Sequence, residues 1–150
     1  MATISICELR IVREDKEVYG LGDNISNPEM ARNTINEIYD LDAQPEEVFC
    51  AIYLNTKHCV EAAHIVSKGS LNASIVHPRE VFKPAFLHNA SAVMVFHNHP
   101  SGDPTPSRED INVTKRLKDA GEMLGIDLLD HIIVAGNIYH SIREGREVKW

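Results

Sequence analysis

Two histidines and an aspartate are spaced so that they could hold one metal ion. His97 and His99 are separated by one residue, and ten residues separate His99 from Asp110. In an extended segment, side chains i and i+2 project to the same side, so both imidazoles can reach one ion. Two neutral imidazoles and one carboxylate suit Zn²⁺, and three protein ligands leave a fourth, catalytic position open for water. The pattern therefore predicts one Zn²⁺ per chain.

The same residues also have interpretations that need no metal. Ser107 stands three residues before Asp110, which is the spacing of a helix capping box. A His-x-His pair alone also occurs by chance. Asp103 and Glu109 are alternative carboxylates, but Asp103 lies in an expected loop, and Glu109 is rotated by about 100° from Asp110 on a helix. A strand end, a rigid turn and an acidic helix start in succession favour metal binding.

The elements around these residues follow from apolar patterning and from turn residues. Residues 92–96 predict a short buried strand that ends at the two histidines. The segment 100–106 holds three prolines and a glycine, so it predicts an irregular loop. Ser107 then caps a long helix that continues to about residue 124 and ends at Gly125, with Asp110 as its third residue.

The rest of the chain alternates between helices and strands. Residues 48–54 are apolar on both faces, which indicates a central strand. Strands are also expected over 3–12 and 59–66, and paired strands over 126–134 and 138–142. A helix is expected from Ser26-Asn27-Pro28 to about Tyr39, with Glu29 completing a capping box. Another helix is expected near 78–88, which Pro84 should kink or delay. This alternation predicts an α/β or α+β class with one mixed sheet and helices packed on it.

The segment from His97 to Asp110 resembles the zinc motif of the JAMM (MPN-plus, or JAB) metalloprotease family as it occurs in RadC-like proteins. It has the sequence His-Asn-His-Pro-Ser-Gly-Asp-Pro-Thr-Pro-Ser-Arg-Glu-Asp. The resemblance extends to residues 76–80 and 129–133 and covers the region 45–143. It implies a cytidine-deaminase-like, three-layer α/β/α fold built around one zinc ion. It also implies hydrolysis of peptide or isopeptide bonds, as in the better-understood branches of the family.

The resemblance implies catalytic roles for Glu47 and Ser107. The family's general base is a glutamate about 45–50 residues before the first histidine, which would take a proton from water and pass it to the leaving amine. Glu47 matches this position and the family's Glu-x-Phe pattern, while Glu46 would project to the opposite face of a strand. Two solvated carboxylates at a strand edge are the simpler alternative. Ser107 would donate a hydrogen bond to the oxyanion while it also caps the helix.

Two further histidines could bear on the site. His131, next to Asp130, could orient a metal ligand. It could equally be a hydrogen-bonded histidine at the edge of a buried strand. His77 heads the helix that begins at Pro78 and could lie near the site.

Length and composition fit one globular domain of 150 residues, with 43% hydrophobic and 25% charged residues. Residues 1–44 are expected to add a strand and a helix to the core formed by the JAMM domain, residues 45–150. Three cysteines without a CxxC pair fit reduced thiols in the cytoplasm. The longest apolar run, residues 48–54, is too short to cross a bilayer, and Glu8 and Arg10 interrupt the first apolar stretch. Neither a membrane span nor a signal peptide is therefore expected.

Three functions compete. The leading one is a zinc metallopeptidase or isopeptidase that acts on a protein or peptide substrate. The second is an accessory factor in DNA repair or recombination, but 22 acidic against 15 basic residues argue against tight nucleic-acid binding. In addition, no helix-hairpin-helix region of the kind found in RadC-like proteins precedes Glu47. The third is a catalytically quiet zinc-binding scaffold, which normally comes with lost ligands, whereas all of them are present here.

Overall fold

A computed structural model describes residues 24–69 and 76–150 of the chain, and the expected strand over residues 3–12 lies outside these ranges. The helices are α1 (Pro28–Tyr39), the 3₁₀ helix η1 (Leu41–Ala43), α2 (Pro78–Leu87), α3 (Arg108–Leu124) and α4 (Ile142–Gly145). The strands are β1 (Val48–Leu54), β2 (Val60–Lys68), β3 (Ala92–Asn98), β4 (Asp127–Ala135) and β5 (Ile138–Ser141). Among the described helices, none combines the length and the apolar character needed to cross a membrane.

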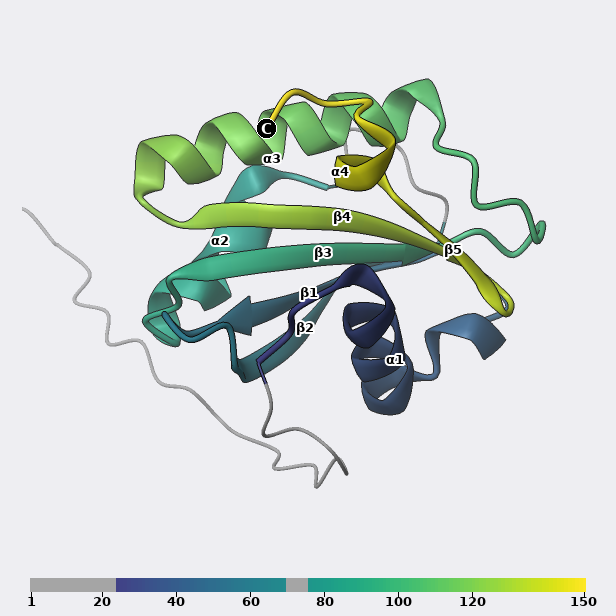
Figure 1. The fold of residues 1–150 in the computed structure, drawn as a ribbon, viewed down its shortest axis with the longest axis horizontal. Helices are drawn as coiled ribbons and strands as arrows, with labels where there is room; N and C mark the ends of the chain where they lie inside the picture. Colours follow the sequence, from purple (N-terminus) through teal and green to yellow (C-terminus); the bar gives the residue numbers. More distant parts are fainter. Residues whose placement is uncertain (1–23, 70–75) are drawn as a thin grey trace, which may run out of the picture.

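The five strands form one mixed sheet in the order β2-β1-β3-β4-β5 (Figure 1). β1 pairs antiparallel with both β2 and β3, β3 pairs parallel with β4, and β4 pairs antiparallel with β5. Helix α1 covers one face of the sheet, and α2 and α3 cover the other. The mixed sheet that the alternation of elements predicted and the three-layer α/β/α arrangement that the resemblance implied are therefore confirmed.

The central strands are apolar on both sides because helices cover both faces of the sheet. Every residue of β1 and of β3 is buried, as expected for strands between two helical layers. The prediction of a central strand over residues 48–54 is confirmed. The strand predicted over 92–96 continues two residues further, to Asn98, because His97 pairs with both Phe49 and Ile133 and Asn98 pairs with Val134.

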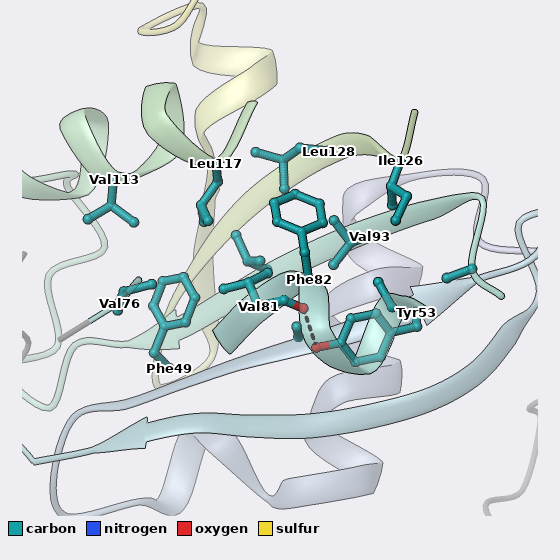
Figure 2. Close-up of a cluster of buried hydrophobic side chains, with 14 residues drawn as sticks. Phe49, Tyr53, Val76, Val81, Phe82, Val93, Val113, Leu117, Ile126 and Leu128 are labelled. Carbon is teal, nitrogen blue, oxygen red and sulfur yellow. Dashed lines mark hydrogen bonds between the residues drawn. The ribbon is translucent and has the colours of Figure 1, made fainter. Parts of the chain in front are cut away.

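Alternate residues of β1 divide between two apolar cores. Phe49 and Tyr53 pack with Phe82 of α2 and Leu117 of α3 in the core shown in Figure 2. The Tyr53 hydroxyl donates a 2.8 Å hydrogen bond to the main-chain oxygen of Val81, so this buried polar group is satisfied. The intervening β1 residues, such as Ile52, face the second core beneath α1. The period-two alternation of a strand thus connects β1 to helices on both sides.

Helix α1 begins one residue later than its predicted capping box implies. The cap is Asn27, whose side chain accepts a 2.8 Å hydrogen bond from the Met30 N–H. Pro28 occupies the first helical position, where a missing N–H costs nothing. The box of Ser26 with Glu29 is therefore wrong, and the Ser26 hydroxyl contacts the sulfur of Met30 instead.

Helix α2 does not start late, as Pro84 had suggested. It begins at Pro78, and Pro84 lies inside it. His77 caps the helix because its Nδ1 accepts a 3.1 Å hydrogen bond from the Arg79 N–H. A favourable cap and a proline at the first position therefore place the start a full turn before Pro84.

Helix α3 has the predicted limits and lies close against the sheet. Ser107 is its N-cap, and Gly125 ends it in the left-handed conformation with φ of 70°. A Cβ atom on Gly121 would lie 2.4 Å from the main-chain oxygen of Ile126 and 3.2 Å from Cζ of Phe82. This close approach requires a glycine, and it sets the position of the helix that carries Asp110.

Candidate metal centre

The three candidate metal ligands converge where β3 ends and α3 begins. His97 is the penultimate residue of β3, His99 follows the strand, and Asp110 is the third residue of α3. His97 is fully buried, His99 is partly buried, and Asp110 is 8% exposed. Each offers one ligand atom, and these atoms all lie within 4.8 Å of one another. The structure thus brings together the residues that the spacing indicated, as a group that could hold a metal ion.

The distances between the donor atoms fit a single ion. Nε2 of His97 lies 2.8 Å from Nε2 of His99 and 3.2 Å from Oδ1 of Asp110. Nε2 of His99 lies 3.6 Å from Oδ2 of Asp110. With metal–ligand bonds of about 2.0–2.1 Å, the donors around a tetrahedral zinc ion lie about 3.3 Å apart. The three observed distances bracket this value, so one ion can reach all three donors.

A main-chain carbonyl orients the ring of His99. Its Nδ1 lies 2.7 Å from the main-chain oxygen of Asp103. A carbonyl oxygen can only accept, so Nδ1 carries the proton. Nε2 faces His97 and Asp110, with a lone pair in the neutral ring and with a second N–H in the charged ring. The side chain of Asp103 is engaged elsewhere, since it accepts a 2.9 Å hydrogen bond from the Thr105 N–H. Asp103 therefore contacts the cluster through its main-chain oxygen and not through its carboxylate.

Asp110 combines the capping and the ligand interpretations. Its Oδ2 accepts a 2.7 Å hydrogen bond from the Ser107 N–H, and the Ser107 hydroxyl accepts a 3.1 Å bond from the Asp110 N–H. Burial by itself raises the pKa of Asp110, but hydrogen bonds with His97 and His99 outweigh it and hold the pKa well below its usual range. The hydrogen bond with Asp110 in turn raises the pKa of His99. This cluster therefore favours a positive charge, whether proton or metal ion.

Glu47 lies at the edge of the same cluster. β1 pairs Phe49 with His97 in antiparallel register, and continuing that register sets Glu47 opposite His99. Glu47 is partly buried, whereas Glu46 is exposed. The charge of Glu47 also contributes to the raised pKa of His99. Glu47 is thus less exposed than Glu46, and its charge acts on His99 of the cluster.

Asn98 is a residue of the site that the sequence reasoning missed. Its side chain is buried, and Oδ1 accepts a 2.7 Å hydrogen bond from the Val48 N–H. Its Nδ2 donates to the main-chain oxygens of Gln44, at 3.2 Å, and Glu46, at 3.0 Å. The carboxamide thus holds the peptide groups on both sides of Glu47. The sequence did carry one signal for this residue. Asn98 lies between two histidines, and in a strand its side chain points to the side opposite theirs.

His131 and His77 make different contacts. His131 is fully buried, and its Nε2 lies 2.8 Å from Nδ1 of His97. Phe49 packs against both rings, with centroids 6.1 Å from His97 and 5.4 Å from His131. His77, by contrast, uses its Nδ1 to cap α2. His131 therefore contacts a candidate ligand, as one of its two sequence interpretations proposed.

The fold is the α/β/α arrangement that the resemblance implied, and it carries a His-His-Asp cluster that could hold a metal ion. The model of the RadC-like JAB domain matches residues 25–148, so the chain belongs to the RadC-like JAB domain family.

The relatives of this chain are longer proteins. A UPF0758 protein of Shouchella clausii is 53% identical over 135 residues, which cover 90% of this chain and 56% of the relative. A UPF0758 protein of Alkaliphilus metalliredigens is 52% identical over 120 residues, or 80% of this chain and 51% of the relative. One of Methanosarcina mazei is 54% identical over 106 residues, or 71% and 46%. The chain thus spans about half the length of the relatives it matches.

The three hydrogen bonds of Asn98 lead to a stability prediction. Asn98→Ala leaves one buried N–H and two carbonyl oxygens without their partner, so it should lower the free energy of unfolding by about 1–3 kcal/mol. Asn137→Ala, at an exposed turn position, is the matched control and should change it by less than about 0.5 kcal/mol. Urea denaturation measures both variants. Equal stability of the two would contradict the role given to Asn98.

Proposed function

We propose that the protein is a zinc-dependent hydrolase of peptide or isopeptide bonds, with His97, His99 and Asp110 as the metal ligands. The observation that carries this proposal is the convergence of two imidazole nitrogens and one carboxylate at the spacing of a single ion. Such a ligand set suits zinc and leaves one coordination position open. When bound, zinc would supply a Lewis acid that lowers the pKa of a coordinated water. Membership of the RadC-like JAB family supports the proposal.

Glu47 is proposed to accept the proton of the attacking water and to pass it to the leaving amine. A carboxylate can do both when it is held within hydrogen-bond reach of the reacting atoms. The register of β1 and β3 sets Glu47 opposite His99. Asn98 holds the peptide groups that flank it. These contacts provide the fixed position that proton transfer needs.

Ser107 is proposed to stabilise the oxygen of the scissile carbonyl as it becomes negative. As the N-cap of α3, its hydroxyl accepts from the Asp110 N–H. A hydroxyl can accept and donate at the same time, so the cap leaves the Ser107 proton available to a substrate. Ser107 is exposed, and a substrate approaching along the loop before α3 could therefore meet it.

The burial of the cluster indicates the side from which a substrate would approach. His97 and His131 are fully buried, and Phe49 packs against both rings. His99 is only partly covered, and Ser107 is exposed. The site is thus closed toward the sheet and accessible near the start of α3. An accessible edge suits an extended peptide, which supports a protein or peptide as the substrate.

Metal content is the direct test of the proposed site. We expect about one zinc ion per chain, and its loss in the His97→Ala, His99→Ala double variant, because a single remaining ligand binds far more weakly. His64→Ala, His140→Ala removes two histidines outside the cluster and should keep the metal. Elemental analysis of the purified proteins measures all three. Stoichiometric zinc in the His97, His99 variant would overturn the assignment.

Glu47 can be tested apart from the metal ligands. Glu47→Gln should retain zinc and native stability but lower turnover by about 100- to 10,000-fold, because the amide cannot accept the proton. Glu46→Gln is the neighbouring control and should keep the parent's turnover. Cleavage of a peptide library, with zinc measured in the same samples, gives both readouts. Release of zinc by Glu47→Gln would make Glu47 a ligand and contradict its role as a base.

The two roles of Ser107 can be separated by substitution. Ser107→Ala should lower stability by about 1 kcal/mol through the lost cap and turnover by about 100-fold or more through the lost donor. Ser107→Asp should keep near-native thermal stability and zinc, because aspartate caps well, but it should have almost no activity. Its ionised carboxylate cannot donate and sets a negative charge against the oxyanion. Native turnover in Ser107→Asp would show that Ser107 is only a cap.

A further inference from the structure

A chain of three buried hydrogen bonds connects the main chain of α3 to the ring of His97. Thr114 Oγ1 lies 2.7 Å from the main-chain oxygen of Asp110 and 2.6 Å from Nδ1 of His131. Nε2 of His131 lies 2.8 Å from Nδ1 of His97. The side chains of Thr114, His131 and His97 all belong to residues with no exposed surface. Their protons must therefore be shared among these groups alone.

The chemistry of the groups permits one direction for these bonds. The oxygen of Asp110 can only accept, so Thr114 must donate its single hydroxyl proton to it. Thr114 Oγ1 can then only accept from the ring of His131, which places a proton on Nδ1 of His131. A second proton on that ring would bury a charge between two neutral partners, which is costly. Nε2 of His131 is thus an acceptor, and His97 donates to it from Nδ1.

We infer that Thr114 and His131 are positioning residues that hold His97 as the tautomer whose Nε2 lone pair faces the metal. The inference rests on the proposed metal site and extends it. With Nδ1 committed as a donor, the ring of His97 can neither flip nor exchange tautomers without breaking the chain. A partner on the far nitrogen of a ligating histidine fixes the ring and raises its basicity. Here that partner is a neutral histidine, which adds no negative charge. The negative charge of the ligand set therefore comes from Asp110.

The chain of hydrogen bonds also connects two proposed ligands that lie on different elements. His97 lies on β3, Asp110 on α3, and His131 on the adjacent strand β4, where it is paired with Val95. The Asp110 residue contributes its side chain to the cluster and its main-chain oxygen to the chain. A shift of α3 along the sheet would therefore disturb both ligands together.

The affinity of the whole protein for Zn²⁺ tests the inference. It is measured by competition with a chromophoric chelator. Thr114→Val keeps the shape but removes the hydroxyl, and it should weaken Zn²⁺ binding by about 10- to 100-fold. Thr114→Ser restores the hydroxyl and should bind like the parent. Tyr53→Phe removes a buried hydroxyl that bonds to Val81, away from the cluster, and should also bind like the parent. This control separates the loss of the hydrogen-bond chain from a general loss of stability.

A second measurement needs only the parent protein loaded with Zn²⁺. Long-range ¹H–¹⁵N correlation spectra distinguish the two neutral tautomers, and they should show protons on Nδ1 of both His97 and His131. A proton on Nε2 of His131, or parent-like affinity in Thr114→Val, would overturn the inference while leaving the zinc site in place. A parent that binds no Zn²⁺ would overturn the proposed function and the inference with it.

Discussion

The pairing of β1 with β3 is the constraint on which the candidate site depends. It aligns Phe49 with His97, and the same register continued beyond the strand ends would set Glu47 opposite His99. Both strands are buried along their whole length. A shift of one residue would turn the Phe49 face of β1 toward the wrong core, so the register is strongly specified. Burial of apolar side chains therefore fixes the position of the polar ones, and Asn98 completes the alignment by binding the backbone on both sides of Glu47.

The start of α3 is the second fixed point, because one carboxylate serves two purposes there. Asp110 accepts from the Ser107 N–H and faces the two histidines. Hydrogen bonds with the two histidines hold the pKa of Asp110 low against the effect of burial, which explains how a carboxylate so little exposed stays ionised. The position of α3 in turn depends on its close contact with the sheet at Gly121. Packing more than ten residues away along the helix therefore controls where a candidate metal ligand lies.

Much of the fold and the ligand set could be predicted because their signals are local. The apolar run of residues 48–54, the His-x-His pair and the Ser107 cap each lie within a short segment. The contacts that hold the ligands join distant residues and left no such signal. Asn98 binds Val48, 50 positions away, and His97 contacts His131, 34 positions away. The strand was expected over 92–96, and the pairing of His97 with β1 and β4 and of Asn98 with β4 carries it further.

The candidate site divides into a buried part that holds side chains in place and an exposed part that meets solvent. Rings and bonds that no solvent reaches hold His97, and a buried amide holds the backbone around Glu47. The loop before α3, by contrast, is largely exposed up to and including Ser107. Substitutions in that loop should leave the buried hydrogen-bond network intact. Substitutions in the network should move the candidate ligands. The exposed Ser107 and its loop therefore meet solvent first, while the network that holds His97 has no contact with solvent.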